Sequence, residues 1–283
     1  MKAGTPSRTA QSVANRRAEH QLFDFPHVLD DPVALWIIGA NAAVSIMFRG
    51  LAAYLPGARD MRAFMVARSR YAEDQLARAI ATGTSQYVIL GAGLDTFAYR
   101  NPYADSDLRV FEVDHPDTQA WKRRRLASIA IRKPYPVTFV PVNFERQRLE
   151  TELERAGFKL HEPAFFSWLG VTPYLSNKTV MATFALVHSL CPDNAIAFDY
   201  AHPREGLSKA EKLAFDALSA RVARAGEPFR GFFNPEVLAK DLKEIGFRRV
   251  EHPTTTQINA LYFRNRFDGF QVRGRLGGLM CAY

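Results

Sequence analysis

The sequence predicts an α/β protein in which helices cover both faces of a mostly parallel sheet, with a helical cap built by the N-terminal segment. From about residue 87 onward, short apolar runs alternate with amphipathic stretches, as strands and helices alternate along a parallel sheet. The first 80 residues have helical character without a strand pattern. The chain ends on an apolar run, which favours an antiparallel strand added at the edge of the sheet.

Each expected element follows from these patterns. Seven strands are expected, at Tyr87–Leu90, Arg109–Val113, Val137–Val142, Ala164–Leu169, Ala195–Tyr200, Arg248–Glu251 and Leu279–Tyr283. Helices are expected at Met61–Thr82, Asp117–Ile131, Asn177–Leu190, 207–225 and Pro235–Ile245. Ser176 and Asn234 precede two of these helices as capping residues. No linker divides the 283 residues, so we expect one domain, with a cap over residues 1–80 and a core over 81–283 that carries a helical insertion at about 204–230.

Composition restricts the class of protein. A hydrophobic fraction of 47% and a charged fraction of 23% are typical of a soluble globular chain. The two cysteines, Cys191 and Cys281, lie far apart, which argues against a disulfide framework or a zinc site and favours a cytoplasmic location. The longest uncharged run, Val33–Phe48, is shorter than the roughly 20 residues that cross a bilayer, so we expect no membrane element.

The formal charge of +8 raises the question of a nucleic-acid partner. The densest basic cluster is Lys122–Arg125, in an expected helix. Four consecutive helical positions point in nearly all directions and cannot form one stripe. We therefore interpret the cluster as a solvated helix surface and expect no nucleic-acid partner.

The sharpest local motif is a glycine turn, Gly91-Ala92-Gly93, directly after the first expected strand. Glycines at this place let the backbone approach a ligand, although a purely structural turn would look the same. The second strand adds Glu112 and Asp114, 21 and 23 residues after Gly91, near the distance at which a carboxylate binds ribose hydroxyls. A helix N-cap is the alternative role for these acids.

The residues after the turn indicate which nucleotide binds. A dinucleotide site requires a third glycine where this chain has Thr96. Asp95, at the start of an expected helix, would repel a pyrophosphate but could meet the ammonium group of an amino acid. These features favour S-adenosylmethionine over a nicotinamide cofactor.

Several motifs in order resemble the leucine carboxyl methyltransferase superfamily, and within it a bacterial branch of S-adenosylmethionine-dependent methyltransferases. The resemblance covers nearly the whole chain. It rests on Leu90–Arg100, on Phe111–Pro116 with the lysine- and arginine-rich helix after it, and on Asp31-Pro32, Ala67–Arg70, Ser167–Leu175 and Gly226–Pro228. It implies a Rossmann-like class I methyltransferase fold, with a seven-stranded mostly parallel sheet, an antiparallel C-terminal strand and a helical N-terminal cap.

The resemblance also implies how the cofactor is held. Asp114 would bind the ribose with support from Glu112, while Gly91 and Gly93 would pass beneath the methionine part. Arg68 matches the family arginine that pairs with the cofactor carboxylate, a task suited to a guanidinium.

Two further parts of the cofactor site follow from the same resemblance. Either Arg16 or Arg17 would supply a second cation from the N-terminal segment. Asn143 and Phe144 would lie beside the adenine, where the family usually has aspartate and leucine, and the Asn143 carbonyl can still accept a hydrogen bond from the adenine amino group.

The expected reaction is O-methylation of a carboxylate or hydroxyl on a small, apolar metabolite, and this reaction requires no metal. Tyr174 matches the family tyrosine after the fourth strand, so the resemblance implies that it would orient the acceptor oxygen. Arg146 would neutralise an acceptor carboxylate, although the family arginine stands one position earlier, where this chain has Glu145. His115 and His202 are candidate bases for a hydroxyl acceptor, although each also fits a turn position.

Other assignments stay open at this point. We expect the aromatic residues of the cap to line an apolar acceptor pocket or to belong to the core; they are Trp36, Phe48, Tyr54 and Phe64. A nicotinamide-dependent oxidoreductase and a catalytically silent cofactor-binding homologue are the alternative functions. The sequence does not indicate an oligomeric state.

Overall fold

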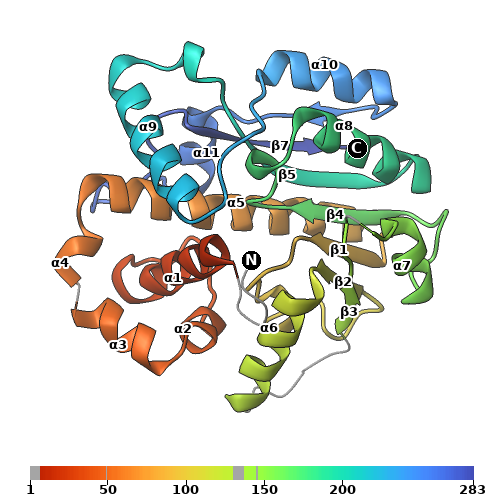
Figure 1. Ribbon diagram of the computed structural model, residues 1–283, viewed down its shortest axis with the longest axis horizontal. Coiled ribbons are helices and arrows are strands. Elements are labelled where there is room, and N and C mark those ends of the chain that lie inside the picture. Colours follow the sequence, from red (N-terminus) through yellow and green to blue (C-terminus); the bar gives the residue numbers. More distant parts are fainter. Residues whose placement is uncertain (1–6, 49, 130–136, 145) are drawn as a thin grey trace.

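A seven-stranded sheet forms the centre of the molecule in the computed structural model, which describes residues 7–48, 50–129, 137–144 and 146–283 (Figure 1). The strand order is β3-β2-β1-β4-β5-β7-β6. The strands are β1 (Gln86–Leu90), β2 (Arg109–Asp114), β3 (Val137–Pro141), β4 (Ala164–Trp168), β5 (Ala195–Ala201), β6 (Val250–Glu251) and β7 (Gly277–Ala282). Neighbours from β3 to β5 are parallel, and β7 runs antiparallel to both β5 and β6. The predicted fold class is confirmed.

Helices cover both faces of this sheet, as the apolar strands require. One face packs against α5 (Pro56–Ala81), α6 (Pro116–Ser128) and α11 (Thr255–Tyr262). The other face packs against α7 (Leu149–Arg155), α8 (Asn177–Leu190) and α10 (Pro235–Ile245). Because side chains alternate along a strand, Val88 and Leu90 of β1 join one core, while Tyr87 and Ile89 join the other.

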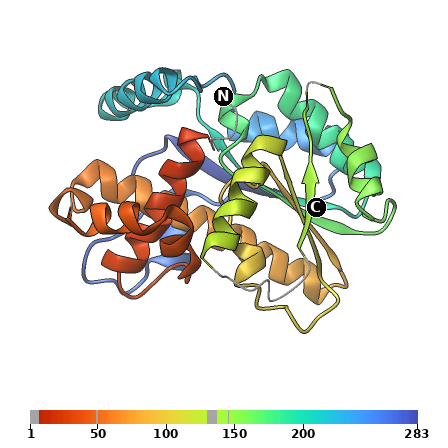
Figure 2. The same ribbon diagram turned by 60° about the horizontal axis from the view of Figure 1, so that its bottom comes forward.

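The N-terminal helices gather beside the sheet, as Figures 1 and 2 show in red and orange. They are α1 (Arg8–Phe23), α2 (Val33–Ile38), α3 (Ala40–Phe48) and α4 (Gly50–Ala53). α5 differs from them because its apolar face, including Val66 and Leu76, is part of the core under the sheet. It also begins at Pro56, before the expected Met61, and proline is favoured in a first helical turn.

The inserted helix is α9 (Lys209–Arg224), which stands away from the body of the molecule in Figure 2. It begins with a complete capping box, in which Ser208 and Glu211 bond each other's backbone N–H groups. Phe215 and Val222 are buried, whereas most of the remaining side chains are exposed or half-buried. Residues of α9 and of β5 line one cavity, so the helix borders a space beside the sheet.

The structure corrects one expectation beside the glycine turn. No α-helix lies between β1 and β2, where all residues are described, and the turn leads into a single 3-10 turn, η1 (Phe97–Tyr99). Pro102 disfavours helical backbone at Asn101, whose side chain instead accepts from the Tyr103 N–H. All three residues of η1 are buried, so this segment is a packed link and not an amphipathic helix.

Smaller differences concern element bounds and two helices that the sequence reading did not include, α7 and α11. Both are short, and the second begins with a capping box of Thr254 and Gln257. The end of the expected helix Asp117–Ile131 falls partly outside the described residues, and α6 ends at Ser128.

Candidate functional site

The glycine turn and the end of β2 are bonded to each other. The backbone N–H of Gly93 donates to Asp114 Oδ2 at 2.5 Å, and the N–H of His115 donates to Asp114 Oδ1 at 2.6 Å. Gly91 and Gly93 have φ of 66° and 48°, values that glycine adopts without strain. Burial raises the pKa of Asp114, while the two N–H donors oppose the rise. Each oxygen keeps a lone pair for a ligand hydroxyl.

Glu112 lies on the same face of β2 as Asp114 but one pleat further from the strand end. It is fully buried beneath α6, where Lys122 Nζ donates to Glu112 Oε2 at 2.6 Å. Burial raises the pKa of Glu112, and Oε1 has no partner among the described residues. The structure thus places Glu112 in a buried ion pair behind Asp114.

Gly91 also adjoins the ends of the neighbouring strands. A Cβ built on Gly91 would lie 2.5 Å from Val171 Cγ2, and a Cβ built on Gly170, the residue before Val171, would lie 2.7 Å from Arg68 Nη2. Arg68 Nη1 donates to Asp199 Oδ2 at 2.8 Å, and Gly170 N donates to Asp199 Oδ1 at 2.5 Å. Since β1, β4 and β5 are neighbours, these contacts form one line along the carboxyl ends of the strands.

Asp199 is a member of this line that the sequence reading did not single out. It is 4% exposed and lies in the second half of β5, in the run Ala195–Ala201 whose other members are apolar or aromatic. The sequence did contain a signal for Asp199: it is the one acid in an otherwise apolar strand, and an isolated buried charge requires a partner. Its partner Arg68 lies 131 residues away in the sequence.

The N-terminal cap closes over the glycine turn. A Cβ built on Gly93 would lie 3.3 Å from the Ala10 side chain of α1. Arg17 is buried on the same helix, donating from Nη2 to Leu94 O at 2.6 Å and from Nε to Asp31 Oδ2 at 2.8 Å. Arg17 is thus the arginine of the N-terminal pair that contacts the turn.

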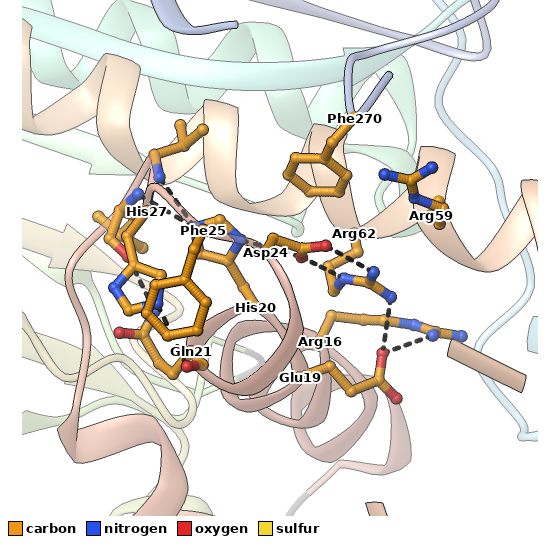
Figure 3. A network of polar contacts seen from close by, with 12 residues as sticks. Arg16, Glu19, His20, Gln21, Asp24, Phe25, His27, Arg59, Arg62 and Phe270 are labelled. Atoms are coloured by element: carbon orange, nitrogen blue, oxygen red, sulfur yellow. Dashed lines mark hydrogen bonds and ion pairs between the residues drawn. The ribbon is translucent and has the colours of Figure 1, made fainter. Parts of the chain in front are cut away.

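Arg16 points elsewhere, as Figure 3 shows. Its Nη1 is 2.7 Å from Glu19 Oε2, which also lies 3.6 Å from Arg62 of α5. Arg62 in turn bonds both oxygens of Asp24, at 2.6 and 2.8 Å. The structure therefore brings Arg16 into a network between α1 and α5 and not to the glycine turn.

The residues expected beside the adenine follow β3, at the sheet edge next to β2. Asn143 donates its backbone N–H to Gln147 Oε1 at 2.8 Å, and Phe144 is 59% exposed. Arg146 is exposed in the same loop. It is three strands away from Tyr174, which follows β4, so the structure does not bring these two predicted catalytic residues together.

A cavity of about 700 Å³ opens between α5, α9 and the ends of β4, β5 and β7. Arg68, Gly170, Tyr174 and Asp199 all line it, so it adjoins the line of contacts described above. Its wall is largely apolar, with Phe64, Met65, Tyr200, Phe215, Leu218 and Phe229 among its members. Two cations of α9, Arg221 and Arg224, line it as well.

Tyr174 lies in η2 (Thr172–Tyr174), and its ring is 5.4 Å from that of Phe229. Burial raises the pKa of Tyr174 to about 12. The phenol therefore stays protonated at neutral pH and can donate a hydrogen bond, but it is a poor base.

Of the four cap aromatic residues that were expected to line an acceptor pocket or to belong to the core, one lines the cavity. Phe64 lines it, but Trp36, Phe48 and Tyr54 are exposed on the outer side of the cap, at 56%, 88% and 51%. They are not among the residues that line the cavity, so they are neither core nor cavity wall.

The two candidate histidines have ordinary structural surroundings. His115 caps α6, accepting from the Asp117 N–H at 3.3 Å, and His202 packs against the Tyr200 ring at 5.2 Å. None of the described residues that line the cavity is a histidine.

The basic cluster of α6 does not form one exposed patch. Lys122 is buried with Glu112, and Arg125 donates to the carbonyl oxygens of Ile37 and Trp36 at 3.1 and 2.8 Å. Arg123 lies over the Phe139 ring at 5.3 Å. Within the described ranges, no helix combines the length and apolarity that crossing a bilayer requires.

Two features define the class of protein as a class I methyltransferase: the strand order with a reversed β7, and the acid at the end of β2 that bonds the glycine turn after β1. The sequence model for "Leucine carboxyl methyltransferase" matches residues 10–188. A Bacillus subtilis (strain 168) relative named "Putative S-adenosyl-L-methionine-dependent methyltransferase YktD" is 30% identical, with 96% of each chain aligned. A Rhodococcus jostii relative with the same descriptive name is 33% identical over 78% of this chain and 72% of its own.

Solved structures agree on the fold. A crystal structure described as a putative methyltransferase from Thermobifida fusca aligns with 99% of this chain and 95% of its own, at 19% identity and a TM-score of 0.56. The chain belongs to the leucine carboxyl methyltransferase family, and with it to the S-adenosylmethionine-dependent methyltransferases. Membership of this family rules out the alternative function of a nicotinamide-dependent oxidoreductase.

The described residues fit this cofactor. Arg68 Nε is buried and has no hydrogen-bond partner, which leaves a charged donor for a ligand carboxylate. At the other end, Asp114 retains acceptor capacity for ribose hydroxyls. The glycine turn and Val171 lie between these two ends, where backbone can approach the ligand closely.

Proposed function

We propose that the protein transfers the methyl group of S-adenosylmethionine to an oxygen of a small, largely apolar metabolite, with a carboxylate as the first choice of acceptor and a hydroxyl as the second. The observation that carries the proposal is the apolar cavity that adjoins the line Gly91–Val171–Gly170–Arg68. In this proposal Asp114 binds the ribose and Arg68 binds the methionyl carboxylate. The free, buried cysteines support a cytoplasmic location.

When bound, the cofactor supplies an electrophilic methyl group on a sulfonium, which is transferred in line to the acceptor oxygen. The residues of the chain orient the acceptor and exclude water. Tyr174 donates a hydrogen bond to the acceptor oxygen, and its raised pKa keeps that proton in place. Arg221 and Arg224 attract an anionic acceptor to the cavity.

The preference for a carboxylate follows from the groups on the cavity wall. A carboxylate is already ionised at neutral pH and requires no general base, whereas a hydroxyl acceptor usually does. The described wall offers no histidine, and each of its three acids already has a partner. Asp199 is bonded to Arg68 and to the Gly170 N–H, Glu211 accepts from the Ser208 N–H in the capping box of α9, and Asp60 lies 3.9 Å from Arg273 Nε. Arg146, exposed beyond β3, does not line the cavity and is not part of this proposal.

The test is incubation with methyl-labelled S-adenosylmethionine and a panel of apolar carboxylic acids and hydroxylated aromatic compounds. Products are identified by mass spectrometry, and mild alkali distinguishes a labile methyl ester from a stable methyl ether. Tyr174→Phe and Arg221→Met should lower turnover, and Arg146→Met serves as the comparison. Binding of the cofactor with no transfer to any acceptor would instead favour a catalytically silent homologue.

A further inference from the structure

We propose that Asp199 is a positioning residue for the cofactor: it holds one edge of the Arg68 guanidinium so that the opposite edge faces the methionyl carboxylate. The inference rests on the assignment of Arg68 to that carboxylate under the proposed function. It gives a role to a buried acid that lies at the border between the cofactor site and the acceptor cavity.

The arrangement of donors on Arg68 is the first step. Nη1 donates to Asp199 Oδ2 at 2.8 Å, while Nε is buried with no hydrogen-bond partner in the described chain. The N–H of Nε and one N–H of Nη2 point to the same side of a guanidinium, away from Nη1. A carboxylate takes two parallel hydrogen bonds from such an edge. With Nη1 held, the Nε–Nη2 edge is the one presented to a ligand.

Asp199 is itself fixed from two directions, which makes it a rigid support. Its Oδ1 accepts from Gly170 N at 2.5 Å, and its backbone oxygen accepts from Thr172 Oγ1 at 2.5 Å. Both donors belong to the segment after β4, so Asp199 ties the end of β5 to the end of β4. Because both strands are in the sheet core, the carboxylate has little freedom to follow a moving arginine.

Gly170 completes the cradle by leaving space for the guanidinium. It has φ of 71°, and a Cβ built on it would lie 2.7 Å from Arg68 Nη2 and 3.1 Å from Nη1. Any side chain here would push the guanidinium from its place. Three elements, namely α5, the loop after β4 and β5, therefore fix the position of one cation.

An unpartnered buried N–H is costly, and a protein that keeps one provides it for a ligand or a water. A bidentate pair with Asp199 would occupy two donors of the Arg68 guanidinium. Here Asp199 Oδ1 accepts from Gly170 N and only Oδ2 bonds Nη1, so the guanidinium keeps donors for a second carboxylate. The alternative is that Asp199 competes with the cofactor for Arg68, and the two roles predict opposite signs on substitution.

The test compares two ligands by isothermal titration calorimetry on the full chain. S-adenosylhomocysteine has the methionyl carboxylate, and 5′-methylthioadenosine retains the adenosine but lacks the amino-acid part. Asp199→Asn should weaken binding of S-adenosylhomocysteine by about tenfold and leave methylthioadenosine binding unchanged. Asp216→Asn is the matched control, because Asp216 also pairs with an arginine but lies on the exposed side of α9. A general loss of structure would weaken the binding of both ligands to the same extent.

A double-mutant cycle shows whether Asp199 acts through Arg68. Arg68→Met should reduce S-adenosylhomocysteine affinity toward that of methylthioadenosine, and adding Asp199→Asn to it should change nothing further. Gly170→Ala gives an independent variant, with the same selective loss expected from displacement of the guanidinium. Thermal unfolding establishes that each variant is folded.

The outcomes separate this inference from the proposed function. If Arg68→Met leaves the ratio of the two affinities unchanged, the assignment of Arg68 to the carboxylate is wrong. If Arg68→Met lowers that ratio but Asp199→Asn does not change it, or tightens S-adenosylhomocysteine binding, then Asp199 is not a positioning residue. Failure of the wild-type protein to bind either ligand would contradict the proposed function itself.

Discussion

Asp114 Oδ2 accepts the backbone N–H of Gly93 at 2.5 Å, so the end of β2 is bonded directly to the turn that follows β1. A single carboxylate thereby shapes the glycine turn and faces the place where the ribose is expected. In the proposed cofactor site this residue supports both the loop and the ligand. Its spacing from Gly91 is short in the sequence because β1 and β2 are consecutive, neighbouring strands.

Asp114→Ala is expected to weaken S-adenosylhomocysteine binding by roughly ten- to a hundredfold, since hydrogen bonds to a charged group contribute about 1.5–3 kcal/mol each. Calorimetric titration measures the change. Asp107→Asn, an exposed aspartate before β2, is the control and should bind as the wild type does. Unchanged affinity in Asp114→Ala would remove this carboxylate from the site.

Gly91→Ala is expected to lower the free energy of unfolding by about 1–3 kcal/mol, because φ of 66° strains an alanine and its Cβ would lie 2.5 Å from Val171 Cγ2. Urea titration gives the value. Gly206→Ala, where no atom lies within 4 Å of the added Cβ, should be nearly neutral.

The steric part of this loss can be separated from the backbone part. Adding Val171→Ala to Gly91→Ala should restore some of the lost stability, because the clashing methyl group is removed. If the stability loss of the double variant equals or exceeds the sum of the two single losses, the clash is not the cause.

The start of α1 is hydrogen-bonded to the loop after α9. Ser7 Oγ donates to Glu227 Oε2 at 3.1 Å, and the Thr9 hydroxyl bonds the same oxygen. Glu227→Ala should speed hydrogen exchange in the first turns of α1 by about tenfold, consistent with the loss of hydrogen bonds to a charged acceptor. Glu205→Ala, an exposed glutamate in η3 (Arg204–Gly206), should leave this exchange unchanged. Equal exchange in both variants would show that the contact does not hold the helix.

His20 should make the protein less stable in mild acid. Its Nε2 accepts from the Val28 N–H at 3.0 Å and its Nδ1 lies 3.1 Å from Asp24 Oδ2, as in Figure 3. Burial lowers the pKa of His20 below 6.5, with Asp24 opposing the shift and the nearby cations reinforcing it. Stability is therefore fully present above pH 6.5 and is lost as the pH falls toward the lowered pKa, because the unfolded state binds the proton first.

The check is urea unfolding of His20→Gln at about pH 7 and pH 5. The variant should be less stable at the higher pH but should lose less stability on acidification than the wild type. His252→Gln, at an exposed histidine, should keep the wild-type slope. An unaltered slope in His20→Gln would assign the acid sensitivity to other groups.

Much of the fold followed from local patterns. Apolar runs located all seven strands to within a few residues, and the terminal run predicted the antiparallel β7. Ser176 and Asn234 cap the helices that they were expected to start. The helix expected after Gly93 is the main exception, because Pro102 and the burial of Phe97–Tyr99 outweighed the general strand–turn–helix pattern.

The site could be predicted where its residues lie close together in the sequence. It could not be predicted as well where its residues are far apart in the sequence and meet through the order of the strands. Asp114 and Gly93 meet because two consecutive parallel strands are neighbours. Asp199 meets Arg68 only because α5 crosses the ends of β4 and β5, a relationship that the order of the sequence does not contain. Glu112 was grouped with Asp114 by spacing and by the family resemblance, although Lys122 partners it beneath α6.

The most direct test of the account is a crystal structure of the protein with S-adenosylhomocysteine. The account predicts the ribose hydroxyls on Asp114, the ligand beside Gly91 and the amino-acid carboxylate on the Nε–Nη2 edge of Arg68, with Asp199 still bonded to Nη1. A cofactor bound elsewhere, or a carboxylate held by Arg16 or Arg17 with Arg68 neutralised by Asp199 alone, would contradict it.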